Sequence, residues 1–178
     1  MEIQDEYRTR DGGRILVSPP AKLHLAAHPE VGAVIEEAVS RIKLPSDRTE
    51  IWTEIEMSRI VGVSGCVEAR RIRETDLTTF AWRKERKHPS RVAVGAEGRP
   101  VSTVVVRALP TANLWIYLLA TAYVGTKAPL EPWDPELKTA QEKDESLDFW
   151  CTHALVYNHA VMGLPFQFSW YEILCRTD

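Results

Sequence analysis

Two apolar segments joined by a short turn constrain the fold of this chain more than any other feature. Residues 101–109 are rich in valine, residues 114–123 are rich in leucine, alanine and tyrosine, and the turn between them is Pro110-Thr111-Ala112-Asn113. β-Branched and aromatic runs bounded by turn residues are typical of strands. Because the second segment is almost continuously apolar, we expect it to be the most buried strand of a sheet.

A helical pattern precedes these strands. Ser18-Pro19-Pro20 is typical of a helix start, with Ser18 as the N-cap and proline in the first turn. Apolar residues then recur at helical spacing, at Leu23, Ala27, Val31, Val34, Ile35, Ala38, Val39 and Ile42. Since proline disfavours a helical conformation in the residue before it, His28-Pro29 predicts an interruption and therefore a hairpin of two helices.

The remaining segments complete the predicted architecture. Residues 59–67, 77–82 and 91–94 are expected to be strands, residues 142–160 a helix, and residues 50–55 either a strand or a short helix. This order predicts an α+β fold in which N-terminal helices pack on a mainly antiparallel sheet of four or five strands, with a C-terminal helix. The length of 178 residues favours a single domain, with an N-terminal extension at 1–17, a core at 18–165 and a C-terminal docking segment at 166–178.

Charge is distributed unevenly along the chain. The net charge of −3 argues against a protein that coats nucleic acid without specificity. Residues 70–91 hold eight lysines and arginines against three acids, whereas residues 131–148 hold seven acids against two lysines. The two segments are either solvated faces that offset each other or a basic site with an acidic flank that binds a partner.

The cellular location follows from what the sequence lacks. No apolar run is long enough to span a bilayer, and the acidic N-terminus lacks the pattern of a secretory signal. The three cysteines are widely spaced, which favours free thiols in a reducing compartment. We therefore expect a cytoplasmic protein with no membrane partner.

His24 and His28 are the first candidates for chemistry. They lie four residues apart, so both can project from one helical face. Histidine titrates near neutral pH, so either ring can act as a general acid or base. With His153 as a third ligand the pair could hold zinc, but no acidic cluster completes a metal motif. The structural alternatives are that His24 and His28 flank a helix that ends at Pro29, and that His153 is a hydrogen-bonded core residue of the last helix.

A basic tract supplies the second set of candidates. Its members carry or can gain a positive charge suited to a phosphate, and they are Arg86, Lys87, His88 and Arg91. The alternative for this tract is an exposed, charge-rich turn. Thr103 and Thr121 could line one face of the sheet, and Tyr123 could stack on a base. The structural alternative for each of them is an ordinary strand residue.

Several enzyme classes are excluded by missing motifs. The chain has no glycine-rich phosphate loop, no nucleophile elbow and no pair of acidic residues on adjacent strands. These absences argue against kinases, α/β hydrolases, dinucleotide oxidoreductases and two-metal nucleases.

The segment Ser18–Glu30, the cation Arg91 ahead of a strand and Thr121-Ala122-Tyr123 at the end of a later strand together resemble the Barnase–EndoU–colicin–RelE-like superfamily. Its members are small metal-independent RNases, many of them toxins of bacterial conflict systems and phage, that pair N-terminal helices with a four-stranded sheet. The resemblance implies that His24 is the acid or base, Arg91 the phosphate clamp and Thr121 a hydroxyl near the site, with no cofactor. The negative net charge and the long C-terminal segment depart from the family pattern and leave room for a repurposed member.

The resemblance also implies a reaction and a partner. The 2′-hydroxyl of RNA would attack the adjacent phosphate and leave a 2′,3′-cyclic end, helped by a base, an acid and a cation. Such an activity harms its producer, which implies an inhibitory, antitoxin-like protein partner. The competing prediction is a non-enzymatic protein-interaction module on the same fold.

Overall fold

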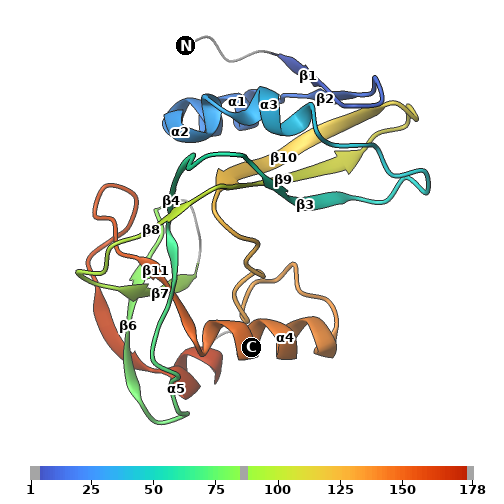
Figure 1. Ribbon diagram of the computed structural model, residues 1–178. Helices are drawn as coiled ribbons and strands as arrows, with labels where there is room; N and C mark the ends of the chain where they lie inside the picture. Colours follow the sequence, from blue (N-terminus) through green and yellow to red (C-terminus); the bar gives the residue numbers. More distant parts are fainter. Residues whose placement is uncertain (1–4, 85–87, 176–178) are drawn as a thin grey trace. The chain divides into compact units, whose positions relative to one another are not determined.

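The computed structural model describes residues 5–84 and 88–175 and shows an α+β protein built mostly from strands, with five helices in those ranges (Figure 1). The chain forms two compact units, unit 1 (residues 1–64 and 100–127) and unit 2 (residues 65–99 and 128–178). Over the described ranges, no helix has the length and apolar character needed to cross a membrane. The expected single domain stays a prediction, because two compact units can unfold together or separately.

Unit 1 contains a five-stranded sheet in the order β1-β2-β10-β9-β3. The strands are β1 (Glu6–Arg8), β2 (Arg14–Leu16), β10 (Ile116–Val124), β9 (Thr103–Pro110) and β3 (Ile51–Glu56). The two apolar segments form the antiparallel pair β9 and β10, β3 pairs antiparallel with β9, and β2 runs parallel to β10. Residues 1–17 therefore contribute two strands to this sheet.

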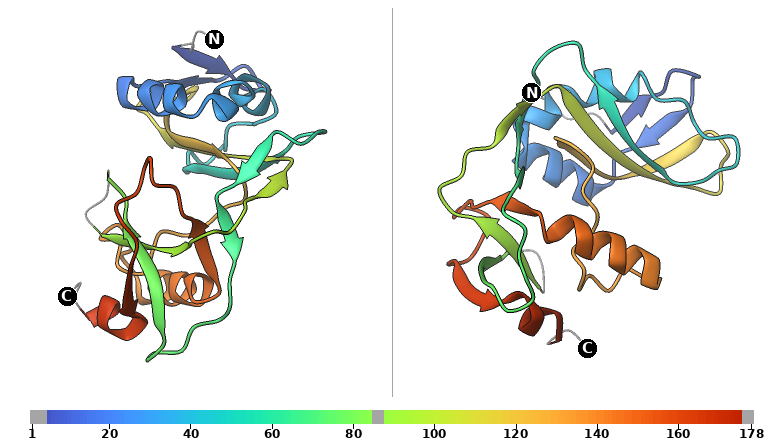
Figure 2. Two further views of the ribbon diagram at one scale, coloured as in Figure 1. Left: turned by 90° about the vertical axis from the view of Figure 1, so that its left-hand side faces the viewer. Right: turned by 60° about the horizontal axis from the view of Figure 1, so that its bottom comes forward.

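Three short helices cover one face of the unit 1 sheet (Figures 1 and 2). They are α1 (Pro19–Ala27), α2 (Pro29–Gly32) and α3 (Ile35–Val39). The predicted helix start is confirmed, because the Ser18 hydroxyl accepts the Ala21 N–H, and α1 ends at the predicted break before Pro29. Leu25, Ile35 and Val39 from the helices share one hydrophobic core with alternate residues of β9 and β10.

Unit 2 contains a second five-stranded sheet, in the order β12-β6-β7-β11-β5. Its strands are β12 (Phe166–Ser169), β6 (Leu77–Trp82), β7 (Pro89–Ala93), β11 (His153–Val156) and β5 (Cys66–Glu68), and its helices are α4 (Ala140–Trp150) and α5 (Trp170–Cys175). Its core is aromatic, with Phe80, Trp133, Trp150 and Trp170 all buried. The short strands β4 (Gly62–Ser64) and β8 (Arg99–Val101) form a further two-stranded sheet.

Several sequence predictions differ from the structure. The expected hairpin of two helices is three short helices, α1, α2 and α3. The described residues form two five-stranded sheets where one sheet was expected. Residues 59–67 were expected to be one strand, but the chain breaks at Gly65 and forms β4 and β5 on either side of it. The predicted helix over 142–160 ends at Trp150, because residues 153–156 pair with both β5 and β7. His153 therefore lies on a strand, and its ring stacks on Phe149 with the centroids 3.9 Å apart.

Candidate functional site

His24 of α1 contacts the open edge of β10. β2 pairs with β10 only along residues 116–118, so within the described residues no strand lies beside the rest of that edge. The Gly125 N–H donates to the Thr103 carbonyl on β9, and the alternation of an antiparallel ladder therefore turns the Ala122 carbonyl toward the open edge. The Nε2–H of His24 donates to this carbonyl over 3.1 Å.

His28 lies directly beside His24. The ring centroids are 4.6 Å apart, which confirms that the two histidines share a face. The Nδ1–H of His28 donates to the Glu30 carboxylate over 3.2 Å. These hydrogen bonds assign a proton to Nε2 of His24 and a proton to Nδ1 of His28. The second nitrogen of each ring can accept a proton, and a ring that is protonated on both nitrogens can donate one.

Thr121 and Tyr123 lie on the face of β10 that points away from the helices. A β-bulge between Leu119 and Thr121 inserts Ala120 into the strand, so that Leu119 and Ala122 both point into the core. Thr121 and Tyr123 flank Ala122 and are half-buried on the opposite face. The His24 ring of α1, bound to the Ala122 carbonyl, lies at the strand edge, whereas the Thr121 and Tyr123 side chains point to the face away from α1.

Thr103 shares this face with Thr121, as predicted. Val104, the next residue of β9, is fully buried in the core, so Thr103 points to the other side. The Thr103 hydroxyl donates to the Gly125 carbonyl over 2.7 Å, and it thereby fixes the end of the β9–β10 pair.

Arg107 is a cation next to Thr121 that the sequence reasoning missed. It lies directly opposite Thr121 in the β9–β10 register, where Cβ atoms are about 5 Å apart. Its side chain is partly exposed and pairs with the Glu50 carboxylate through Nε. Arg107 is the single charged residue of the segment 101–109, which was the signal available, but its position opposite Thr121 depends on strand register.

Arg91, the predicted phosphate clamp, is buried in unit 2. Its guanidinium donates to the main-chain carbonyls of Arg70, Trp150 and His153 over 2.8, 3.1 and 3.2 Å. Burial lowers the pKa of this guanidinium from its ordinary value. His24 and Thr121 belong to unit 1, so the three predicted catalytic residues are divided between the units. A clamp role for Arg91 stays a prediction and requires these hydrogen bonds to be exchanged for a ligand.

His88, predicted to bind RNA, belongs to a buried polar cluster in unit 2, whereas Arg86 and Lys87 lie outside the described residues. The Trp133 indole N–H donates to His88 Nδ1 over 2.9 Å, and His88 Nε2 lies 3.4 Å from the Asp134 carboxylate. The neighbouring Glu131 carboxylate accepts from the Ser90 hydroxyl over 2.6 Å.

The polar cluster also has the donor set of a metal site. Ligand atoms of His88, Glu131 and Asp134 all lie within 4.8 Å of one another. A metal bound to His88 Nε2 needs the ring proton on Nδ1, which would then face the indole N–H of Trp133. The existing hydrogen bonds suit a neutral His88 with its proton on Nε2, so we assign the cluster to the packing of unit 2.

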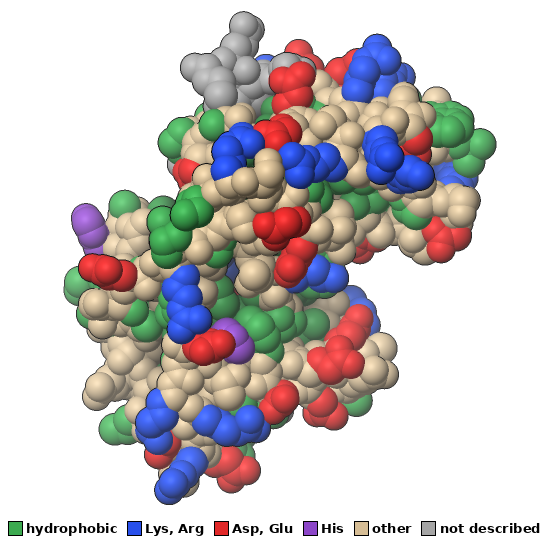
Figure 3. All heavy atoms as spheres, viewed as in Figure 1, with side chains coloured by type: hydrophobic (Ala, Val, Ile, Leu, Met, Phe, Trp, Pro, Cys, Tyr) green, Lys and Arg blue, Asp and Glu red, His purple; other side chains and the backbone are tan. Residues whose placement is uncertain are grey.

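The basic and acidic segments partly neutralise each other. Arg71 pairs with Asp148 over 2.8 Å and Arg83 pairs with Glu131 over 3.2 Å, and both pairs join residues 70–91 to residues 131–148. On the face drawn in Figure 3, side chains of both signs are interspersed. This arrangement favours two solvated faces over a separate basic site.

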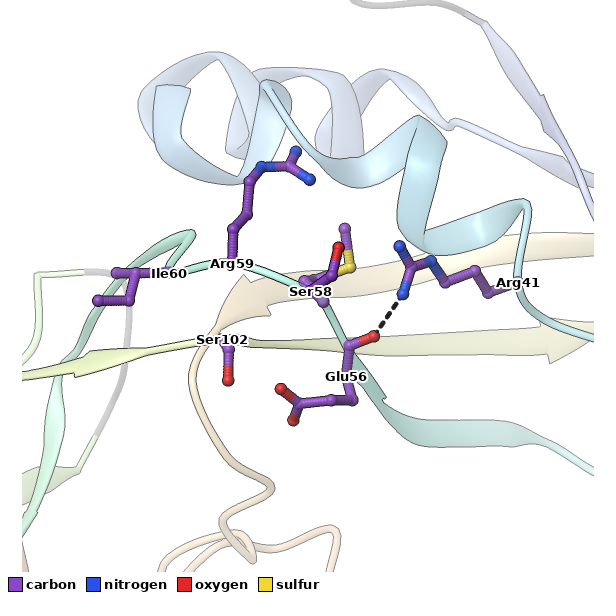
Figure 4. A pocket seen from close by; sticks show the side chains of 7 residues that line it. Arg41, Glu56, Ser58, Arg59, Ile60 and Ser102 are labelled. Atoms are coloured by element: carbon purple, nitrogen blue, oxygen red, sulfur yellow. Dashed lines mark hydrogen bonds between the residues drawn. The ribbon is translucent and has the colours of Figure 1, made fainter.

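Two hollows follow the open edge of β3 in unit 1. The first, of about 450 Å³, is lined by Arg41, Glu56, Met57, Ser58, Arg59, Ile60 and Ser102 (Figure 4). Arg41 donates to the Glu56 carbonyl over 2.6 Å. Hydrogen bonds from Arg59 and Arg41 lower the pKa of the Glu37 carboxyl. An anion in this hollow would have to displace Glu37 from both guanidinium groups.

The second hollow, of about 540 Å³, is lined by residues 41–43, Pro45 and residues 50–56. It shares Arg41 and Glu56 with the first, so the two follow each other along β3. Trp52 is its one tryptophan, and the ring is half-buried.

Comparison of the chain with protein-family models, with curated proteins and with solved structures found no match. The functional conclusion therefore depends on the residues and geometry of the site.

Proposed function

We propose that this protein is a metal-independent endoribonuclease with its site at the edge and adjoining face of β10 in unit 1. The observation that carries the proposal is the contact between His24 and His28 at the strand edge, with different ring nitrogens protonated. RNA cleavage through the 2′-hydroxyl requires one group that takes a proton and one that gives a proton, and two adjacent histidines supply both when one ring is neutral and the other is protonated on both nitrogens. The proposal retains the resemblance to the Barnase–EndoU–colicin–RelE-like superfamily.

The reaction balances within this pair. His24 Nδ1 accepts the proton of the 2′-hydroxyl as its oxygen bonds to the adjacent phosphorus. The bond from phosphorus to the 5′-oxygen breaks, and His28, which must start the reaction protonated on both ring nitrogens, gives the proton on Nε2 to that oxygen. The products are a 2′,3′-cyclic phosphate and a 5′-hydroxyl, with no net uptake of protons.

Arg107 takes the place of Arg91 as the cation of the site. It lies opposite Thr121 on the sheet face away from α1, so an RNA strand that binds both Arg107 and the histidines would have to pass around the open edge of β10. A guanidinium at this position stabilises the negative charge that develops on the phosphate oxygens, and the Thr121 hydroxyl can donate to the same oxygens. Since an active RNase damages the cell that makes it, the proposal also retains a cytoplasmic location and an inhibitory protein partner.

The test is RNA cleavage by purified protein in excess chelator. We expect the wild type to cleave, and His24→Ala and His28→Ala each to cut about 10² to 10⁴ times more slowly, because each removes one proton-transfer group. His159→Ala is the matched control, since His159 is an exposed histidine of unit 2, and it should behave as the wild type. Intact RNA with the wild type would favour the non-enzymatic interaction module instead.

A further inference from the structure

A row of three side chains crosses the unit 1 sheet on the face away from the helices. Trp52 of β3 lies opposite Arg107 of β9, and Arg107 lies opposite Thr121 of β10. Ile51 and Ile55 are buried in the helix-covered core, so Trp52 between them points to the other face. Neighbouring strands are about 5 Å apart, which puts Trp52 about 10 Å from Thr121.

The Trp52 ring is flanked by two cations. Lys127 Nζ lies 4.5 Å and the Arg107 guanidinium carbon 5.6 Å from its ring centroid. Both cationic residues are held by carboxylates. Glu50, just before β3, accepts from Arg107 Nε, and Glu54 of β3 accepts from the main-chain N–H of Lys127. Both cations lie over the ring, so a base that stacks on Trp52 takes the place of one of them, and the displaced cation can then pair with a phosphate.

The main chain of β3 adds hydrogen-bonding groups beside this ring. The Met57 N–H donates to the Ser102 carbonyl. The main-chain N–H and C=O groups of the odd-numbered residues of β3 therefore point toward β9. By alternation, the N–H and C=O groups of Trp52 and Glu54 point to the open edge of the sheet, which the hollow of about 540 Å³ follows. Main-chain donors and acceptors at this edge can contact the edge of a base that stacks on Trp52.

We propose that Trp52 stacks on a base of single-stranded RNA, one position along the strand from the phosphate held between Arg107 and Thr121. The proposal rests on the function proposed above and extends its substrate to unpaired RNA, because a duplex hides the base faces that stacking requires. The RNA strand then runs across the strands of the sheet, from β10 over Arg107 to Trp52. Base identity matters little, since every base has a face that can stack.

Binding is measured by fluorescence anisotropy with a labelled single-stranded oligonucleotide in which every 2′-hydroxyl is 2′-O-methyl, so that cleavage is impossible. We expect Trp52→Ala to raise the Kd about tenfold and Trp52→Phe to keep most of the affinity, because phenylalanine retains a stacking ring. Trp115→Ala is the matched control, since Trp115 is an exposed tryptophan in the β9–β10 turn, and its Kd should equal that of the wild type. The duplex form of the oligonucleotide should bind more weakly.

The outcomes separate this inference from the proposed function. A Kd that is the same in the wild type and in folded Trp52→Ala overturns the stacking role, even if RNA is cleaved. No binding by the wild type also overturns it. A Kd that rises in Trp52→Ala while the wild type leaves RNA intact supports the binding surface and contradicts the nuclease.

Discussion

At the scale of single residues, Arg107 carries the electrostatic part of the proposed reaction. We predict that Arg107→Gln lowers kcat/KM for RNA about 10²-fold, because a positioned donor to the transition-state charge is lost. The free energy of unfolding should change by no more than about 1 kcal/mol, since the ion pair with Glu50 is partly exposed. Arg59→Gln removes a comparable arginine paired with Glu37 and is the control. Equal kcat/KM in the two variants would rule out the role of Arg107.

Cys66 gives a residue-scale prediction for stability against pH. Burial, with a smaller effect of the Glu131 charge, raises the pKa of its thiol from 9.0 to about 11. A raised folded-state pKa contributes stability that is complete below pH 9 and is lost as the pH rises toward 11. The wild type should therefore lose stability relative to Cys66→Ala over this range, by roughly 2 kcal/mol at most. Urea unfolding of both proteins at pH 8, 10 and 11 measures the difference, and parallel curves would contradict the prediction.

At the scale of elements, α4 is stabilised by a capping box. The Thr139 hydroxyl accepts the Glu142 N–H over 3.1 Å, and the Glu142 carboxylate accepts the Thr139 N–H over 2.8 Å. We predict that Thr139→Ala lowers the free energy of unfolding by about 1 kcal/mol, because the Glu142 N–H loses its acceptor. Thr139→Ser keeps the acceptor and should cost much less. Denaturant unfolding compares the two, and equal losses would show that the cap contributes nothing.

Local signals account for most of what the sequence predicted correctly about the elements. Ser18-Pro19-Pro20 starts α1 where expected, and Leu77–Trp82 is β6 with the predicted bounds. The helix predicted over 142–160 stops early because strand pairing with β5 and β7, which lie far away in the sequence, determines residues 153–156. For the same reason residues 50–55 stayed ambiguous until their pairing with β9 was known.

The residues of the candidate site also differ in whether a local sequence pattern or long-range strand pairing brings them together. His24 and His28 could be identified from sequence because helical spacing alone brings them together. Arg107 and Trp52 could not, because their place beside Thr121 depends on the registers of three strands. The position of Arg91 at a predicted strand is a local signal, whereas its burial among main-chain carbonyls is a tertiary property that no local pattern predicts.

At the scale of the whole molecule, each unit has its own hydrophobic core. Ile35 in unit 1 and Phe80 in unit 2 are both fully buried, so Ile35→Ala and Phe80→Ala should cost about 2–5 and 3–5 kcal/mol. If the chain is the single domain predicted from sequence, both variants lower the midpoint of one common transition in calorimetry. A second transition that only one variant shifts would show that the units unfold independently.

The most direct test of the account is cleavage of an RNA oligonucleotide that contains one 2′-deoxy nucleotide, in excess chelator. The account predicts that the wild type cuts the all-ribose control to fragments with 2′,3′-cyclic phosphate ends and leaves intact the one linkage that lacks its 2′-hydroxyl. Cleavage at the 2′-deoxy position, or cleavage that appears only when a divalent metal is added, would contradict the proposed His24–His28 mechanism.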